Sequence, residues 1–308
     1  MTTAIVLWIA FATFVATFVG WAVATGAHDA TIGWIVTVPL IAAALLPAVL
    51  AAIYFVLAWV FRTPRPATHR IGLAATVRLF WNEAVAIAVS WPRMALFRWL
   101  IREPAPAPAT TPVILLHGVL CNAGVWRGLC TYLGARGIGA VYALTYGPPL
   151  ASIEEFSAQL DARIDEVLAA TGADRVALVG HSMGGLVARA YLRRYGSGKV
   201  ALVLTLGTPH HGSVHAWLFP GVSLAQLRPG SAWLAKLNQD EGKPFAMRFV
   251  SLWSWHDSMV APQASSRLGG AVNVELDGIG HNALLGDERV FECVTRELAN
   301  LPTNESPA

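Results

Sequence analysis

Two long apolar stretches open the chain and set it apart from an ordinary soluble domain. No charged side chain occurs from Met1 to Ala27, nor from Thr31 to Phe61. Each run exceeds the ~20 residues that a helix needs to cross the hydrocarbon core of a bilayer. The short polar segment GAHDAT between them can turn the chain. The pattern therefore predicts a hairpin of two transmembrane helices, at about 4–25 and 32–61.

Pro39 and Pro47 lie inside the second predicted span. A membrane helix tolerates proline because it can kink or tilt. A cleaved signal peptide is the alternative for the first run, since Ala22-Val23-Ala24 resembles a cleavage site, but no basic residue precedes that run. We expect the hairpin to be retained.

A basic segment follows the second span. Seven arginines lie from Arg62 to Arg102, with Glu83 as the only acid among them. Arginine-rich flanks mark the cytoplasmic side of a membrane, so the chain after the hairpin is expected on that side. Residues 78–101 mix aromatic side chains with arginines, as in a helix lying among lipid headgroups. A helix packed on the following domain is the alternative, and a third crossing is disfavoured by the ionisable residues within it.

Beyond a proline-alanine linker at 102–112, short apolar runs alternate with helical patterns. Ser152 and Glu155 form a capping box at the start of one helix. Strands and helices that alternate at this interval predict an α/β fold with a mostly parallel sheet covered on both faces. Strands are predicted at 113–116, 140–144, 175–179, 200–206, 249–254 and 271–276, and helices at 123–134, 152–168, 186–195 and 287–299.

Composition agrees with a membrane-attached domain. Charged residues make up 13% of the chain and hydrophobic residues 55%, with a mean hydropathy of +0.51. The net charge of +3 does not indicate nucleic-acid binding, because the arginines cluster beside apolar sequence. Cys121, Cys130 and Cys293 cannot complete a set of disulfides and match no zinc spacing, so reduced thiols are expected.

The stretch VALVGHSMGGLVARAY places Ser182 between a predicted strand and a predicted helix. A serine hydroxyl needs an adjacent base and must stand clear of the backbone to act as a nucleophile. A tight strand-to-helix turn achieves this, and its crowding favours small residues such as Gly180 and Gly184. Ser182 is therefore the candidate nucleophile, and a glycine-rich turn without chemistry is the alternative.

Chain order then selects the partners of the serine. Where this motif supplies a nucleophile, an acid and then a histidine follow it. His281 lies beyond every plausible acid and is the candidate base. Asp257 is the preferred acid, because it follows a predicted strand, where sites of open parallel sheets gather. The other acids considered are Asp240, Glu241, Glu275 and Asp277.

Two amides are expected to form an oxyanion hole: Met183, after the nucleophile, and Val119, in the loop after the first strand. His117 and Gly118 are expected to shape that loop, and His181 to pack beside the serine. His210 and His211 raise the possibility of a metal, but neighbouring side chains point apart and no third ligand stands at a recognisable spacing. No metal or cofactor is therefore expected. His256 is expected at the rim of the site.

Several motifs together resemble the bacterial triacylglycerol lipases and related esterases of the α/β-hydrolase superfamily. They are VILLHGVLCN, LVGHSMGGLVARAYLRR, TLGTPHHGS, SWHDSMVAPQASS and GIGHNALL, and the resemblance covers roughly 112–300. It implies the nucleophile, acid, base and oxyanion amides given above, and a sheet that begins at the superfamily's third strand. It also implies a cap at about 213–247, after the sixth strand of the superfamily, with apolar residues Trp217, Leu218, Phe219, Leu224, Trp233 and Leu234.

Two departures from that family matter. Secreted lipases carry a cleavable signal where this chain has an apolar hairpin, and the calcium ligands that some of them use have no counterpart that we can place. The expected protein is therefore a serine hydrolase of lipid or acyl esters, anchored in a bacterial inner membrane with its catalytic domain in the cytoplasm. Thioesterase, phospholipase, amidase or acyltransferase chemistry would use the same site, and a non-catalytic binding module is a further alternative. The expected division is 1–61 hairpin, 62–111 juxtamembrane segment and linker, 112–300 catalytic domain, and 301–308 tail.

Overall fold

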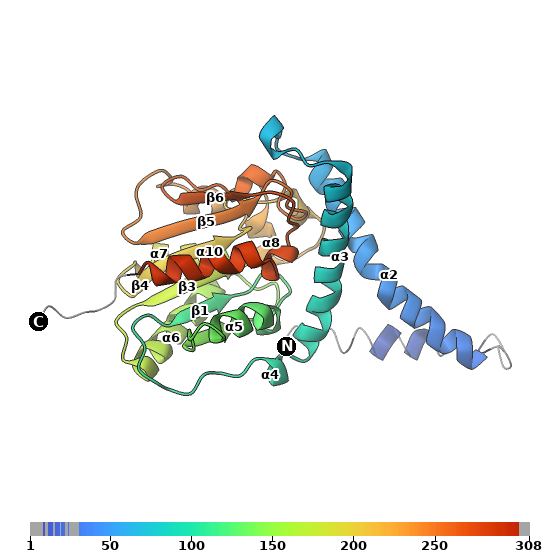
Figure 1. The fold of residues 1–308 in the computed structure, drawn as a ribbon, viewed down its shortest axis with the longest axis horizontal. Helices are drawn as coiled ribbons and strands as arrows, with labels where there is room; N and C mark the ends of the chain where they lie inside the picture. Colours follow the sequence, from blue (N-terminus) through green and yellow to red (C-terminus); the bar gives the residue numbers. More distant parts are fainter. Residues whose placement is uncertain are drawn as a thin grey trace, which may run out of the picture.

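The computed structural model describes residues 31–301 and a few helical positions between 9 and 24. The first predicted span, 4–25, and the tail therefore lie largely outside the described residues. Figure 1 shows a sheet domain with two long helices, α2 and α3, along one side of it.

The core of the domain is a six-stranded sheet in the order β2-β1-β3-β4-β5-β6, and each neighbouring pair is parallel. The central strands read as unbroken apolar runs because both of their faces are buried. This confirms the α/β prediction, with strand bounds within two residues of those expected. The strands are β1 Val113–Leu116, β2 Val141–Leu144, β3 Val176–His181, β4 Val200–Leu206, β5 Arg248–Ser254 and β6 Val272–Leu276.

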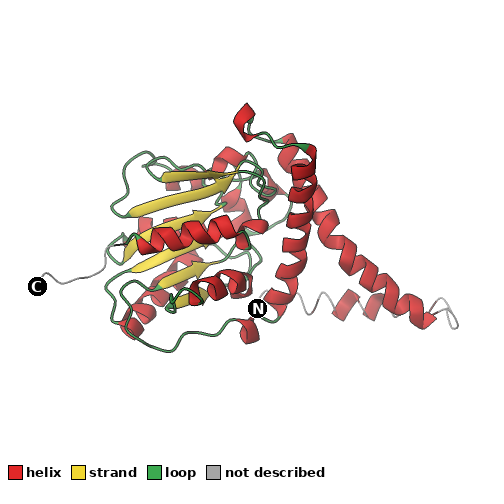
Figure 2. Cartoon of the chain, in the orientation of Figure 1, coloured by secondary structure: helices red, strands yellow, loops and turns green. Residues whose placement is uncertain are grey.

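Helices cover both faces of this sheet (Figure 2). Alternate residues of β1 and β3 point to opposite faces: Ile114 and Leu178 join one core cluster with α6 and α7, whereas Leu115 and Val179 join the other with α5 and α10. The predicted capping box at Ser152 and Glu155 is present. The helices are α5 Arg127–Gly134, preceded by a 3₁₀ turn at Ala123–Trp126, α6 Ile153–Thr171, α7 Met183–Tyr195 and α10 Glu288–Ala299.

The N-terminal helices are α2 Thr31–Val60 and α3 Leu73–Ala95, followed by the short α4 Phe97–Leu100. Among the described residues, Thr37–Val60 and Leu73–Ala95 are long and apolar enough to cross a membrane by length and composition. α3 lies between α2 and the sheet domain and buries Leu79, Glu83, Ala84, Ile87 and Met94. The expected helix at 78–101 therefore begins earlier and is interrupted at Leu96.

Three short helical segments follow β4, in the stretch where a cap was expected: a 3₁₀ turn at Val214–Trp217, α8 Val222–Leu227 and α9 Ala232–Leu237. Leu224 and Leu234 of this stretch pack into the core of the sheet domain. Trp217, Leu218 and Phe219 remain exposed. α8 and α9 thus pack on the sheet domain through their leucines. Opening of a lid here stays a prediction.

Candidate active site

Ser182 occupies a strained turn between β3 and α7. Its backbone has φ 54° and ψ −124°, a region that residues with a side chain rarely adopt. The turn is held from both sides: the Ser182 amide donates to Leu206 O at 2.9 Å, and the Thr208 hydroxyl donates to Ser182 O at 2.8 Å. The side chain is only partly buried. A strained serine standing at a strand end is the geometry that an exposed nucleophile requires.

The flanking glycines show why the turn tolerates no larger residue. A Cβ on Gly180 would lie 2.5 Å from the Gly185 nitrogen, and one on Gly184 would lie 2.2 Å from Leu116 O. Gly185 is equally confined, with its Cβ position 2.1 Å from the Thr208 hydroxyl. The backbones of β1, β3 and α7 thus meet too closely here for any side chain. The sequence motif predicted the need for glycine at 180 and 184 but not at 185.

His281 and Asp257 lie side by side and are almost fully buried. His281 Nδ1 lies 2.9 Å from Asp257 Oδ2. A carboxylate only accepts hydrogen bonds, so in the neutral imidazole Nδ1 is the donor to Asp257 and Nε2 is the acceptor. Asp257 Oδ1 in turn accepts from the amides of Met259, at 2.8 Å, and Val260, at 2.7 Å. The acid is therefore fixed in one orientation toward the imidazole.

The serine turn and the His281–Asp257 pair meet at the same end of the sheet. Leu206, which accepts from the Ser182 amide, is followed by Gly207. A Cβ on Gly207 would lie 3.0 Å from Asp257 Oδ2 and 3.3 Å from His281 Nδ1. His181, next to the serine, contacts His281 through the His281 carbonyl, 3.0 Å from His181 Nε2. The segments that carry the three predicted residues thus lie at one end of the sheet.

The other candidate acids are engaged elsewhere. Asp277 pairs with His69 at 3.0 Å, and Glu275 accepts from the Trp255 indole at 2.8 Å. Glu241 pairs with His211, and Asp240 with Lys243. Asp257 is accordingly the acid whose carboxylate contacts His281.

The environment of His281 adjusts its basicity in opposing directions. Burial lowers the pKa of His281, whereas the charge of Asp257, its hydrogen bond and the charge of Glu83 raise it, and the net pKa lies above the ordinary value. A neutral imidazole is needed to accept a proton from serine. The site is therefore expected to gain activity as pH rises through that raised pKa.

The two predicted oxyanion residues border one small cavity. Val119 and Met183 both line a space of about 10 Å³, together with Gly118 and Leu120. That volume suits roughly one water-sized group. Met183 is the first residue of α7, where amides have no acceptor within the helix. The loop of Gly118 lies against the serine, because a Cβ on Gly118 would be 3.1 Å from Ser182 Cβ. These positions suit an oxygen bound to Ser182.

Four other histidines lie at or near the site. His117 stacks on Tyr146, and burial lowers the pKa of His117 to about 4. Burial also lowers the pKa of His181 well below its usual value. His210 contacts the hydroxyls of Thr205 and Ser251 inside the core, whereas His211 faces outward toward Glu241. In the described part of the chain, no group of three or more His, Cys, Asp and Glu side chains is placed to hold a metal.

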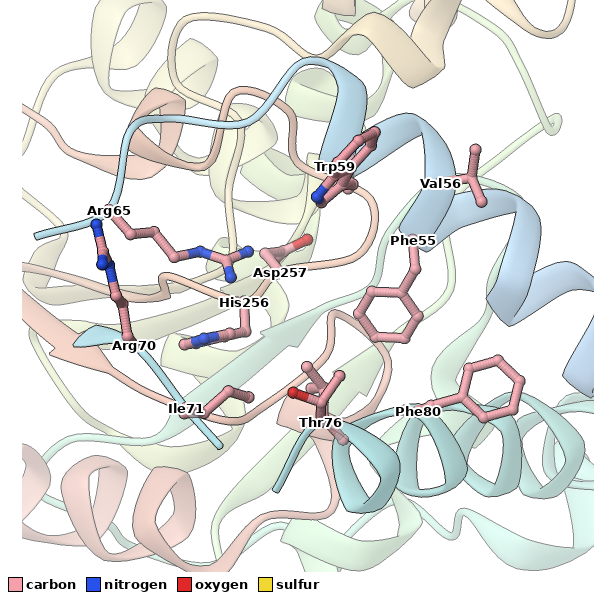
Figure 3. Close-up of a pocket in the computed structure, with 12 residues that line it drawn as sticks. Phe55, Val56, Trp59, Arg65, Arg70, Ile71, Thr76, Phe80, His256 and Asp257 are labelled. Atoms are coloured by element: carbon pink, nitrogen blue, oxygen red, sulfur yellow. The ribbon is translucent and has the colours of Figure 1, made fainter. Parts of the chain in front are cut away.

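A larger cavity, of about 500 Å³, lies on the side of Asp257 that faces the N-terminal helices (Figure 3). Phe55 and Trp59 of α2 and Phe80 of α3 form its apolar end. Arg65 and His256 lie at its polar end. His256, which was expected to line the site, lines this cavity and is otherwise buried, with Nδ1 accepting from the Gly278 amide at 3.2 Å. The N-terminal helices therefore wall in the acid side of the site.

Glu83 is the residue at this site that the sequence reading did not assign to it. Although it belongs to α3, its side chain is fully buried against the loops that carry Asp257 and His281. The only local signal was a single acid within a basic, apolar segment.

Parts of the chain are similar to known proteins. The PGAP1-like alpha/beta domain matches residues 145–266. A triacylglycerol lipase of Burkholderia plantarii is 34% identical over 164 residues, which are 46% of this chain and 44% of that protein. A 1-acylglycerol-3-phosphate O-acyltransferase of Homo sapiens is 33% identical over 150 residues, which are 45% of this chain and 40% of that protein. The chain thus spans less than half the length of the curated relatives it matches.

Among solved structures, lipase B of Aspergillus fumigatus superimposes with a TM-score of 0.59 at 21% identity, covering 68% of this chain and 58% of that chain. At this identity the likeness concerns the fold, which is the parallel sheet with flanking helices described above. The chain therefore has the α/β-hydrolase fold, and part of its sequence is similar to triacylglycerol lipases.

Proposed function

We propose that this protein is a membrane-anchored serine hydrolase of lipid or acyl esters, with Ser182, His281 and Asp257 as its catalytic triad. The observation that carries the proposal is the strained, partly exposed Ser182 at the same sheet end as the buried His281–Asp257 pair. A carboxylate-oriented imidazole beside an exposed serine is the arrangement used for acyl transfer on several unrelated folds.

In the proposed reaction, His281 Nε2 accepts the hydroxyl proton while Ser182 Oγ attacks the ester carbonyl carbon. The carbonyl oxygen becomes negative and is stabilised by the amides of Val119 and Met183. The C–O bond to the alcohol then breaks as His281 returns the proton to the leaving oxygen. Water, activated by the same imidazole, releases the acid from the acyl-enzyme.

The proposed membrane attachment rests on large apolar side chains that are exposed at the surface of the protein. Along α2, large apolar side chains such as Leu40, Val56 and Trp59 are exposed. The cap lies next to this helix, because the His215 ring contacts Tyr54 O at 3.3 Å. Trp217, Leu218 and Phe219 extend the same apolar surface from the cap, and we name them the cap patch. A bilayer around α2 would cover the cap patch and deliver lipid esters beside the site.

The orientation follows from charge. Arginines are concentrated after α2, at positions 62–102, and transferring them across a bilayer is disfavoured. The proposed location of the catalytic domain is therefore the cytoplasmic face of a bacterial inner membrane. With two spans, the N-terminus lies on the same face.

Acyl transfer to an alcohol other than water is the second candidate. The relative named as an acylglycerol-phosphate acyltransferase favours it, and the same acyl-enzyme would serve both reactions. The two differ only in the nucleophile that attacks the acyl-enzyme. Adding glycerol or lysophospholipid to the assay and measuring the new ester against free acid would separate them.

The proposal is tested by labelling the detergent-solubilised full chain with a fluorophosphonate probe, followed by hydrolysis assays across p-nitrophenyl acyl esters. Labelling and hydrolysis are both expected to disappear in Ser182→Ala. The matched control is Ser90→Ala, whose hydroxyl donates within α3 to Ala86 O. A wild-type protein that neither labels nor hydrolyses any ester, or labelling that persists in Ser182→Ala, would overturn the proposal.

A further inference from the structure

The carboxylate of Glu83 joins the two loops that carry the proposed acid and base. Glu83 Oε1 accepts from the Ser258 hydroxyl at 2.6 Å, and Ser258 directly follows Asp257. The same oxygen accepts from the Asn282 amide, at 3.0 Å, directly after His281. These contacts reach across about 175 and 199 positions of sequence. One side chain from outside the sheet domain therefore touches the neighbours of both residues.

Further bonds complete the coordination of this carboxylate. Glu83 Oε2 accepts from the Ala283 amide at 3.0 Å, and Oε1 also accepts from the Asn282 side-chain amide at 2.9 Å. Ser258 extends the network, because its oxygen lies 3.3 Å from the amide of His281 itself. Each partner of the carboxylate donates a hydrogen bond to it. An ionised carboxylate accepts hydrogen bonds with both oxygens, so it suits this set of partners.

The backbone of the base loop is shaped to admit Glu83. A Cβ on Gly280, the residue before His281, would lie 2.4 Å from Glu83 Oε2. Any side chain at that position would push the loop away from the carboxylate. The close approach therefore depends on a glycine at 280 as well as on an acid at 83.

We propose that Glu83 is a positioning residue for the triad, which makes α3 a working part of the active site rather than a tether alone. This inference rests on the proposed function, since the residues it positions are the proposed acid and base. Glu83 does not touch the reacting atoms. It acts by holding Ser258, Asn282 and Ala283, and so fixes the relative placement of Asp257 and His281.

A purely architectural alternative is that Glu83 only docks α3 on the domain. Electrostatics separates the two roles, because the charge of Glu83 also raises the pKa of His281. The other ionisable groups facing His281 are Asp257, His181 and His215. Burial lowers the pKa of both neighbouring histidines, so they stay neutral in the range where His281 titrates. Asp257 and Glu83 are thus the charges that set its titration.

The experiment compares Glu83→Gln with wild type in the full-length, detergent-solubilised protein. The glutamine has nearly the same shape, but its NH₂ group faces donors and its charge is gone. We expect kcat to fall about a hundredfold, because small misplacements of a catalytic group cost that much. KM for a short p-nitrophenyl ester is expected to change little. The acidic limb of kcat/KM should move to lower pH, since removing a nearby negative charge lowers the pKa of His281.

Glu83→Asp provides the matched conservative change. It keeps the charge but its shorter chain cannot reach all four donors, so kcat should fall while the acidic limb stays near the wild-type position. Glu103→Gln controls for the chemical change itself, because Glu103 is an exposed glutamate paired with Arg163 on the surface. Thermal unfolding of each variant shows whether it is folded at the assay temperature.

The outcomes are distinct. Wild-type kcat and an unmoved acidic limb in folded Glu83→Gln would overturn the inference while leaving the proposed triad standing. A reduced kcat with an unmoved limb would also overturn it, in favour of docking alone. If Glu83→Gln does not fold, Glu83→Asp decides: wild-type kcat in that variant overturns the inference. Failure of the proposed function is recognised separately, by a wild-type protein without esterase activity or probe labelling.

Discussion

Replacing Asp257 with asparagine tests the proposed acid by exchanging one carboxylate oxygen for an NH₂ group. Asparagine has the size of aspartate but offers one acceptor oxygen and one NH₂ donor. In the structure, Oδ1 of Asp257 accepts from the amides of Met259 and Val260, and Oδ2 faces His281 Nδ1. The asparagine oxygen is therefore expected in the Oδ1 position, with its NH₂ toward the imidazole. His281 must then accept at Nδ1 and carry its proton on Nε2, so it can no longer take the proton of Ser182.

The size of the expected loss in activity follows from the free-energy cost of turning the asparagine amide to the opposite orientation. Turning the amide would restore the useful tautomer but would leave the Met259 and Val260 amides facing an NH₂ group. Each unsatisfied buried donor costs about 1–3 kcal/mol, so two cost roughly 2–6 kcal/mol. At about 1.36 kcal/mol per tenfold change, the active orientation becomes roughly thirty to twenty-five thousand times rarer. The tautomer effect in triads is about ten-thousandfold, so we expect kcat of Asp257→Asn near the upper end of this range.

The assay is steady-state hydrolysis of a short p-nitrophenyl ester by purified Asp257→Asn, with thermal unfolding to establish that the variant is folded. Asp240→Asn is the matched control, because Asp240 is an exposed partner of Lys243. The reasoning would be refuted if Asp257→Asn kept activity within tenfold of wild type. It would be replaced by another acid assignment if Asp277→Asn or Glu275→Gln lost activity instead.

Three further predictions address the turn, the surface and the topology. Gly184→Ala should lower the melting temperature of the protein or prevent folding, because its Cβ would lie 2.2 Å from Leu116 O; a variant that melts like wild type would contradict this. Serines at Leu218 and Phe219 should reduce hydrolysis of vesicle-bound esters about tenfold relative to a soluble short ester, as expected for losing a buried apolar contact with lipid; an unchanged ratio would argue against the cap patch. Fusion reporters should be active as periplasmic reporters at Thr31 and as cytoplasmic reporters at Ala308, and a C-terminal fusion active in the periplasm would reverse the proposed orientation.

The sheet was predictable because each strand is a short apolar run between turn residues, and buried parallel strands require such runs. The capping box at Ser152 was equally local, since its partners stand three positions apart. The positions of Ser182 and His281 could be inferred because the motif fixes both a strand-to-helix turn and an order along the chain. Helix ends were less well predicted: α7 begins at Met183 directly after the serine, where the apolar pattern suggested Leu186.

Features that depend on contacts between distant segments were not accessible in the same way. The leucines of α8 and α9 have the composition of a lid underside, and only the packing shows that Leu224 and Leu234 belong to the main core. His256 is buried where the segment before α3 reaches the end of β5, since Arg65 donates to Trp255 O at 2.8 Å and His69 stacks on Trp255. A hydrophobic pattern states that a side chain is buried, but it does not state which surface buries it.

The role of Glu83 becomes clear only from its contacts with distant segments of the chain. In the sequence, an acid within an apolar segment is evidence against a membrane crossing, because an ionised carboxylate is costly in lipid. The structure supplies the complementary half of that argument: the buried charge is offset by donors from Ser258, Asn282 and Ala283. A buried carboxylate that loses its donors is strongly destabilised. Separating α3 from the domain would therefore leave the Glu83 carboxylate without its donors and would remove the contacts that position Asp257 and His281. Because α3 follows the proposed anchor helix α2 in the chain, this contact connects the proposed anchor with the proposed chemistry.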